Sequence, residues 1–384
     1  MKIRKKLWKH LSRCDNIFDV GANCRNIGCD SMKYDFNKQS VFQGVEFCSI
    51  KANGFKSSCI SINFVLPLGE KASLYALVPN VLTRSSRVYP DRASIERKLA
   101  NLYGADIAVD VSKVGENQVL KVVVSCIDDR FALDNEIISA ESSKLLFELV
   151  FNPKIDNGAF SHNEVESEKR LLAERLYAEQ SDKRTYAKNK CEELMFSEEA
   201  YGIHRLGSVE DIERITPEAL YEAYCEILKT AKIAVCVSGN ADEEAVLGKL
   251  KEYTGKVNRS FIMGETLFVE RAEDVQYCKE REPVKQGKLV MGFRMGMKNA
   301  DDNYAARRVM VDLFGGSPHS KLFTVVREKM SLCYYCSARM IRAKGIMFVQ
   351  SGIESFNEEK AKEAILQQLE DIKNGNFSDE SVEA

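Results

Sequence analysis

The sequence predicts an α+β fold made of two homologous domains, each a mainly antiparallel sheet with helices packed on one face. Three observations support this prediction. At 384 residues, the chain is too long for one ordinary core and suggests two domains. Stretches with the alternating apolar pattern of strands are interleaved with stretches of helical period. The same order of stretches then restarts in the second half.

The composition excludes several classes of function. The chain is 45% apolar and 29% charged with a net charge of −2, which is ordinary for a globular protein. This balance indicates neither a nucleic-acid partner nor an acidic substrate. No apolar run approaches the roughly 20 residues that span a bilayer, so a membrane partner is not indicated either. The basic N-terminus lacks the apolar centre of a signal peptide, and we expect a cytoplasmic location.

The domain boundaries follow from the two copies. We expect residues 1–31 to be an extension, 32–255 an N-terminal domain, and 262–384 a C-terminal domain. The Phe-Ser at 377 echoes the Phe-Ser at 160, an offset of 217 residues (377 − 160). The first copy continues for 82 residues from Phe160 to Asp242, whereas the second has seven residues after Phe377. We therefore expect the second domain to be incomplete at its C-terminal end.

In the first half, apolar residues alternate from Cys59, which predicts a strand. A helix over 74–82 is expected to be interrupted by Pro79. Thr216 as N-cap and Pro217 at the first helical position predict another helix start. The remaining predicted elements are a helix over 92–103, strands over 106–111 and 119–126, a helix around 144–147, a long helix over 164–196 and a strand over 233–238.

In the second half, a strand over 289–295 and a helix over 303–314 are expected to precede a Gly-Gly-Ser-Pro turn. Apolar residues then recur at helical spacing from Leu322 to Met330. Ser331 ends this helix, and a strand is predicted over 332–339. Arg327 is thereby placed near the C-terminal end of a helix, and Tyr334 on the strand that follows.

This turn, helix and strand resemble the second half of the insulinase/pitrilysin-type zinc peptidases, the inverzincins. Arg327-Glu328-Lys329 and Tyr334 match an Arg/Tyr pair of that family, which implies a substrate-binding role for Arg327 and Tyr334. One departure is Ser331, where the family usually has glycine. A second resemblance runs from Tyr201-Gly202 to Leu220, with the strand end at Gly239-Asn240. It implies a fold like that of mitochondrial processing peptidase.

The zinc motif of this family, H-x-x-E-H on a helix, is degenerate here. Two histidines at i and i+4 ligate zinc in active members, and the glutamate activates the bound water. Aligning on Tyr89-Pro90 places Ala76 and Asn80 at the histidine positions and Pro79 at the glutamate position. The same alignment keeps one distal carboxylate as Glu168. It sets Arg175, which has no lone pair to offer, at a zinc-ligand position.

The chain's four histidines contain no i, i+4 pair that could replace the motif. We therefore expect no metal and no cofactor in this chain.

Twelve cysteines in a chain of this length do not suggest a disulfide scaffold. Cys333 and Cys336 have the C-x-x-C spacing of a redox or metal site. On a regular strand, however, side chains three residues apart point to opposite faces. We therefore interpret both as structural residues.

Three functions remain open from sequence. The resemblance favours a zinc-less, non-catalytic subunit of a two-chain metallopeptidase. Its partner would be a zinc-bearing insulinase-family subunit, encoded by a neighbouring gene, and the pair would act on a peptide or protein. The alternative is a peptide-binding or scaffold protein with no share in catalysis. A cysteine-dependent enzyme is the third class, but nothing in the sequence places a histidine or an acid beside any cysteine.

Overall fold

The computed structural model describes residues 35–133, 135–255, 257–378 and 380–383. The predicted extension, residues 1–31, lies outside the described residues. The α+β class is confirmed, and the contacts divide the chain into two compact units. The N-terminal unit comprises residues 32–178 and 203–265, and the C-terminal unit includes residues 179–202 and 266–384. No helix in the described part of the chain is long and apolar enough to cross a bilayer.

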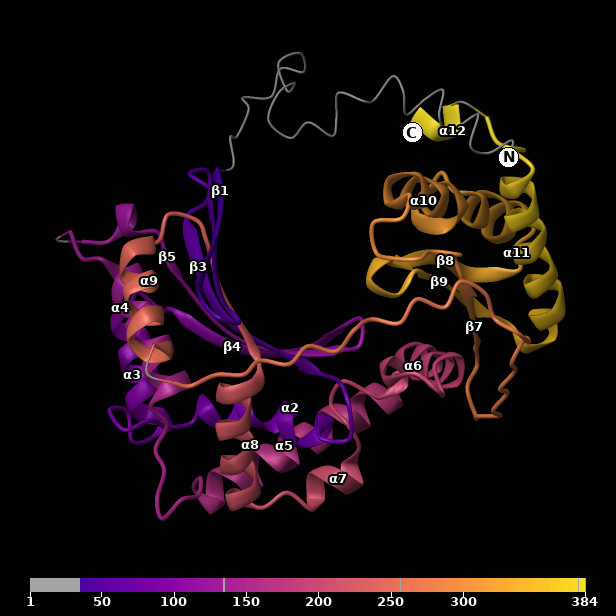
Figure 1. Ribbon diagram of the computed structural model, residues 1–384. Helices are drawn as coiled ribbons and strands as arrows, with labels where there is room; N and C mark the ends of the chain where they lie inside the picture. Colours follow the sequence, from indigo (N-terminus) through magenta and orange to yellow (C-terminus); the bar gives the residue numbers. More distant parts are fainter. Residues whose placement is uncertain (1–34, 134, 256, 379, 384) are drawn as a thin grey trace. The chain divides into compact units, whose positions relative to one another are not determined.

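The N-terminal unit contains a six-stranded sheet in the order β1-β2-β6-β3-β5-β4 (Figure 1). Its strands are β1 (Asp35–Phe42), β2 (Val45–Lys51), β3 (Ser57–Pro67), β4 (Asp106–Val114), β5 (Asn117–Ile127) and β6 (Lys232–Ser238). β2 and β6 run parallel, whereas the other neighbouring pairs are antiparallel. The sheet is therefore mixed, which refines the mainly antiparallel sheet that the sequence predicts.

The apolar face of this sheet carries the core of the unit. Ile60 and Ile62 on β3 are fully buried, and Phe64 is nearly so. Between them, Asn63 points to the other face, where its amide donates to the Ala234 carbonyl at 2.9 Å. Because successive side chains alternate between faces, the sequence pattern alone places the core on one side.

Helices cover that apolar face (Figure 1). They are α2 (Ala72–Leu82), α3 (Arg92–Asn101), α4 (Ile138–Phe151), α5 (His162–Ser181), α7 (Val209–Glu213), α8 (Pro217–Thr230) and α9 (Glu243–Thr254), with a 3₁₀ turn at Asp129–Phe131. α8 begins as predicted, since the Thr216 hydroxyl accepts from the Ala219 amide at 3.2 Å. The predicted interruption at Pro79 is wrong, because α2 runs through this residue with both neighbours buried.

The C-terminal unit contains a three-stranded antiparallel sheet in the order β7-β9-β8. Its strands are β7 (Gly287–Arg294), β8 (Cys333–Ile341) and β9 (Ile346–Ile353). Its helical segments are α6 (Lys183–Met195), α10 (Tyr304–Val311), the π-helical segments η3 (Asp312–Gly316) and η4 (Leu322–Lys329), α11 (Glu358–Lys373) and α12 (Glu380–Glu383). Three 3₁₀ turns complete it, at Ala200–Gly202, Arg342–Lys344 and Ser355–Asn357.

Helices cover both faces of this second sheet, which corrects the prediction of helices on one face. On β9, Met347 and Val349 join the core beneath η3, η4 and α11. Ile346 and Phe348 point the other way and pack with Phe196, in the segment that follows α6. Figure 1 shows α6 beside β7, with α10 and α11 on the opposite side of the sheet. Burial on both sides explains why β9 begins with four consecutive apolar residues, Ile346 to Val349.

The long helix predicted over 164–196 is two helices, and this prediction is corrected. α5 ends at Ser181, and Asp182 has an extended backbone and caps α6. Its carboxylate accepts from the Arg184 amide at 3.1 Å and from the Thr185 hydroxyl at 2.6 Å. The break lets α6 belong to the C-terminal unit although it precedes α7–α9 in sequence. The domain boundaries at 255 and 262 stay a prediction.

Candidate functional site

Arg327 and Tyr334 line the same pocket of the C-terminal unit. The pocket has a volume of about 650 Å³ and lies between the end of η4, the start of β8 and the segment after β9. Its other lining residues include Glu328, Ser331, Cys333, Glu354 and Phe356. The sequence predicts this proximity; a substrate-binding role for the pair stays a prediction.

The chain reverses between the two residues at Ser331. This residue has a left-handed backbone with φ +52°, and its hydroxyl donates to the Glu328 carbonyl at 3.3 Å. The reversal lets β8 begin two residues later, beside the helical segment that carries Arg327. Gly315, in η3, also packs against β8, where a Cβ would lie 2.7 Å from the Ala338 nitrogen. The glycine of the predicted turn is therefore required for close packing.

Arg327 keeps its hydrogen-bond donors available. Its guanidinium lies over the Phe323 ring, 4.3 Å from the centroid, an arrangement that orients the side chain. Among the residues that the structure describes, no carboxylate forms an ion pair with it. A half-buried, positioned guanidinium without a carboxylate partner can bind a carbonyl or carboxylate of a ligand.

Tyr334 is 52% exposed, and its hydroxyl donates to Glu354 Oε1 at 3.0 Å. This hydrogen bond to a carboxylate raises the pKa of Tyr334, so the phenol stays protonated at neutral pH. Glu354 orients the phenol over the pocket. A ligand oxygen would have to take the place of Glu354 to receive the same proton.

Cys333 and Cys336 lie on the same face of β8, which corrects the sequence interpretation. β8 carries a bulge: Cys333 faces Ile353 on β9, but Tyr335 faces Gly352, leaving Tyr334 as the extra residue. One inserted residue shifts the alternation of side chains, so residues three apart share a face. Both cysteines accordingly pack in the core beneath η4.

The degenerate zinc-motif positions do come together in the N-terminal unit. On α2, the buried Asn80 amide donates to the Ala76 carbonyl at 2.9 Å. Arg175 on α5 donates to Asn80 Oδ1 at 3.4 Å. A permanently cationic guanidinium therefore points at the position where the family motif has a histidine. Pro79, one residue before Asn80, adds no donor or acceptor side chain.

The neighbouring carboxylates are engaged with other partners. Glu168 is 4% exposed and forms an ion pair with Arg84. Glu164 accepts from the Ser85 hydroxyl at 3.0 Å, and burial raises its pKa. Within the described ranges, no group of three or more His, Cys, Asp or Glu side chains could hold a metal ion. The residues at the motif positions do not fit zinc.

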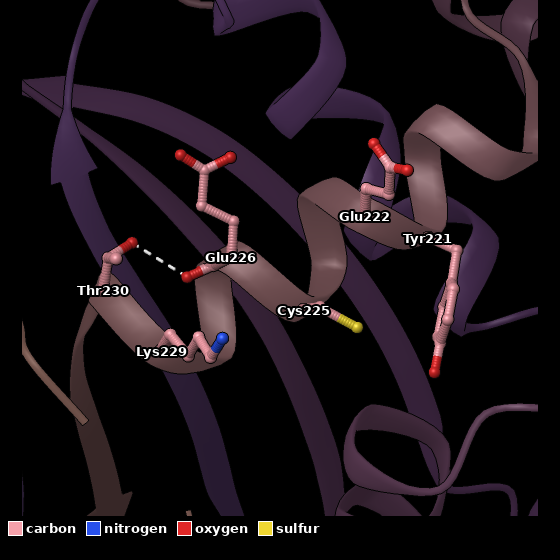
Figure 2. Close-up of a pocket in the computed structure, with 6 residues that line it drawn as sticks. All are labelled: Tyr221, Glu222, Cys225, Glu226, Lys229 and Thr230. Carbon is pink, nitrogen blue, oxygen red and sulfur yellow. Dashed lines mark hydrogen bonds between the residues drawn. The ribbon is translucent and has the colours of Figure 1, made fainter. Parts of the chain in front are cut away.

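A second hollow, of about 330 Å³, lies along α8 (Figure 2). It is lined by Tyr221, Glu222, Cys225, Glu226, Lys229 and Thr230. Glu226 is paired with Lys71 at 2.7 Å, and Thr230 donates to the Glu226 carbonyl at 2.8 Å. The sequence predicts no functional residue here. Since the carboxylate is neutralised by its own lysine, we assign no chemistry to this hollow.

Comparisons with known proteins agree with this arrangement. Residues 214–384 match a family described as the peptidase M16 inactive domain. The "Probable inactive metalloprotease YmfF" of Bacillus subtilis is 32% identical over 352 residues, which cover 91% of this chain and 83% of that protein. The "Uncharacterized zinc protease YmfH" of the same organism is 26% identical over 237 residues, 58% of this chain and 53% of that protein.

Two solved structures have the same fold. A conserved protein from Enterococcus faecalis V583 superposes with a TM-score of 0.81 and 27% identity, over 91% of this chain and 82% of that one. A peptidase M16 inactive domain from Pseudomonas fluorescens superposes with a TM-score of 0.71 and 15% identity, over 90% of this chain and 81% of that one. Because a relative above 30% identity matches nearly the whole chain, and the zinc positions hold Ala76, Pro79, Asn80 and Arg175, the chain belongs to the M16 peptidase family as a probable inactive metalloprotease homologue.

Proposed function

We propose that this chain is the non-catalytic subunit of a two-chain M16 peptidase and that Arg327 and Tyr334 bind the substrate. The observation that carries the proposal is the shared pocket of these two residues, in a chain whose zinc positions are degenerate. A chain that kept substrate contacts while losing the metal would depend on a partner for hydrolysis. We propose that this partner is a zinc-bearing M16 subunit.

The proposed chemistry follows from the donors in the pocket. A planar guanidinium and a protonated phenol can both donate to the carbonyl of a peptide bond, and more strongly to the oxyanion that forms from it. One well-placed donor of this kind contributes about 3 kcal/mol to lowering the barrier. Water activation and zinc would come from the partner, since the residues at positions 76, 79, 80 and 175 supply neither.

The likeness to YmfH, which is named as a zinc protease, supports a partner from among zinc-bearing M16 proteins. The alternative function is a peptide-binding or scaffold protein without any share in catalysis. It would retain the pocket as a recognition site only. The two functions differ in one property, the dependence of cleavage on Arg327.

The test is reconstitution with a zinc-bearing M16 protein encoded beside this gene. The two chains are co-expressed, co-purified and assayed against a library of unstructured peptides. The Arg327→Ala variant should keep the complex and lower kcat by about 10²–10³-fold, the scale for losing one oxyanion donor. Arg339→Ala, which removes an exposed arginine from the same strand β8, is the matched control and should leave kcat unchanged.

Each other outcome is informative. A stable complex whose kcat does not respond to Arg327→Ala would support the scaffold function. Failure of the chains to associate, with full cleavage by the zinc-bearing chain alone, would contradict the subunit proposal. For the purified single chain, metal analysis should give well under one equivalent of zinc, and a stoichiometric metal would contradict our assignment of the motif.

A further inference from the structure

The bulge in β8 creates a pair of thiols at the edge of the pocket. Cys336 faces Ser351 on β9 in the regular ladder, whereas Cys333 lies before the extra residue, Tyr334. Both side chains turn to the core face, where Cys333 packs against the cluster that contains Cys336, and each thiol shifts the pKa of the other. Because a disulfide requires neighbouring Cβ atoms on one face, the bulge removes the geometric objection that a regular strand would raise.

The two thiols differ in access. Cys333 is half-buried and lines the pocket, so a small molecule can reach it. Cys336 is 4% exposed and is not among the residues that line the pocket. An accessible thiol with a shielded thiol beside it is the arrangement in which one cysteine attacks and the other resolves.

The surroundings also favour the thiolate of Cys333. The hydrogen bond with Cys336 outweighs burial and, with the positive charge of Arg327, lowers the pKa of Cys333 to about 7. The same hydrogen bond raises the pKa of Cys336. Other charged groups lining this pocket are Glu328 on η4 and Glu354 after β9.

Other cysteines of the chain contrast with this pair. Burial raises the pKa of both Cys126 and Cys191 to about 11, which makes them poor nucleophiles. Cys278 is exposed, so its accessibility exceeds that of Cys333. It therefore provides an internal control that separates exposure from thiolate chemistry.

We propose that Cys333 and Cys336 are a redox-active pair that interconverts between dithiol and disulfide. The oxidant is a low-molecular-weight disulfide. The Cys333 thiolate attacks one of its sulfurs, forms a mixed disulfide and expels one thiolate, which takes up the proton of Cys336. The resulting Cys336 thiolate then attacks the Cys333 sulfur, closes the intramolecular disulfide and expels the second thiolate, which is protonated by water. Two electrons pass to the oxidant, and a dithiol reductant reverses both steps.

The oxidation state would change the pocket directly. In the reduced form, Cys333 lies near Arg327, and its thiolate partly neutralises the positive charge of the guanidinium. The disulfide carries no charge, so Arg327 would then present its full positive charge to a ligand. Closure would also bracket Tyr334 within a short covalent loop and restrict its motion. This proposal stands on the thiol geometry and does not depend on the function proposed for the Arg327/Tyr334 pair.

The experiment uses the full chain, reduced and freed of reductant, with glutathione disulfide as the probe. Trypsin releases residues 330–339, which contain both cysteines. We expect this peptide to lose two hydrogens and to resist alkylation, and dithiothreitol to restore both thiols. Cys278, in the same sample, should form only a glutathione adduct. Separate glutathione adducts on Cys333 and Cys336, or modification of Cys278 alone, would overturn the proposal.

Two variants test the role of Cys336 by a second measurement, the rate at which iodoacetamide labels Cys333 at pH 6.5. Cys336→Ala removes the hydrogen-bond donor and should slow labelling several-fold. Cys336→Ser keeps a donor and should preserve the rate, yet with glutathione disulfide it should stop at the adduct on Cys333. Equal labelling rates in wild type and Cys336→Ala would contradict the proposed activation of Cys333.

Discussion

At the scale of single residues, Ser331 combines a side chain with a left-handed backbone, φ +52°. This conformation costs a residue with a Cβ about 1–2 kcal/mol. Glycine avoids the strain, but it gives the unfolded chain more conformational entropy, which lowers stability by about 0.4–1 kcal/mol. We expect Ser331→Gly to stabilise the protein by about 0.5–1 kcal/mol, seen as a higher urea midpoint.

Ser317 is the matched control. It lies before η4, the helical segment that Ser331 follows, and its backbone is extended, with φ −133°. Here glycine relieves no strain, and Ser317→Gly should lower stability by about 0.5–1 kcal/mol. If the two variants shift the midpoint in the same direction, strain at Ser331 is not the cause.

Residue placement was predictable from sequence only where local geometry decides it. The sequence predicts that Arg327 and Tyr334 lie close together, because a helix that turns directly into a strand brings residues seven positions apart near each other. The shared face of Cys333 and Cys336 was missed, because the bulge depends on the register with β9. Cross-strand register is a long-range property that the spacing of two cysteines does not contain.

At the scale of elements, a buried ion-pair cluster fixes the segment after α6 to the second sheet. Glu199 accepts from Lys344 at 2.7 Å and from Arg294 at 2.5 Å, and all three side chains are at most 8% exposed. Arg294 also lies over the Phe196 ring, 4.6 Å from its centroid. Removing one member leaves buried charges without compensation.

We therefore expect Glu199→Gln to lower the free energy of unfolding by about 3 kcal/mol at pH 7. Burial alone would raise the pKa of Glu199, but hydrogen bonds from Arg294 and Lys344 lower it below 4.5. A carboxyl whose pKa is lower in the folded than in the unfolded chain stabilises the fold at any pH above its unfolded-state pKa. This stabilisation is lost as the pH falls through the folded-state pKa. The difference between wild type and variant should thus shrink below pH 4.5.

Glu193→Gln is the control, since this exposed residue of α6 pairs only locally with Lys190. It should change stability by no more than about 0.5 kcal/mol. Urea unfolding of wild type and both variants from about pH 2.5 to 7 makes the measurement, because the predicted loss lies below pH 4.5. A pH-independent loss in Glu199→Gln would mean that packing, not charge, accounts for it.

Elements were predictable where the sequence carries its own capping residues. Thr216-Pro217 marks the start of α8, and Asp91 caps α3 one residue before its predicted start. The break at Asp182 was missed because it follows a continuous helical pattern. It places α6 against β7, a contact between residues far apart in sequence. At Pro79, burial against the sheet outweighs the lost backbone hydrogen bond.

At the scale of the whole molecule, the internal repeat has a topological counterpart. The antiparallel order β3-β5-β4 in the N-terminal unit has the same form as β7-β9-β8 in the C-terminal unit. Phe160 and Phe377, the anchors of the sequence echo, are both buried. The repeat itself stays a prediction that superposition of the two sets of three strands would test.

The C-terminal unit should not be soluble as a fragment of residues 266–384. Without residues 179–202, the face of its sheet that carries Phe348 and Val290 would be exposed. Each large apolar side chain so exposed costs about 1.5–3 kcal/mol. Joining residues 179–202 to the fragment through a Gly/Ser linker should restore solubility and a cooperative unfolding transition.

The control is the same fusion carrying Met195→Asp, which places a charge in the contact with Gly292 of β7. That fusion should behave like the bare fragment. A soluble, cooperatively folded fragment 266–384 would instead show that the sheet needs no cover from α6.

The placement of α6 also sets an order of events during synthesis. β7 begins 85 residues after Gly202 (287 − 202), and at roughly 5–20 residues per second the ribosome needs roughly 4–17 s to make that stretch. A 13-residue helix is marginal alone in water, so α6 must wait, largely unfolded, for its sheet. By the end of this interval the last strand of the N-terminal sheet, β6, has also been made. The nascent chain therefore carries an unpacked insertion through this interval, with Phe196 and Tyr201 as its exposed apolar side chains. A chaperone that recognises such side chains would bind the nascent chain there first.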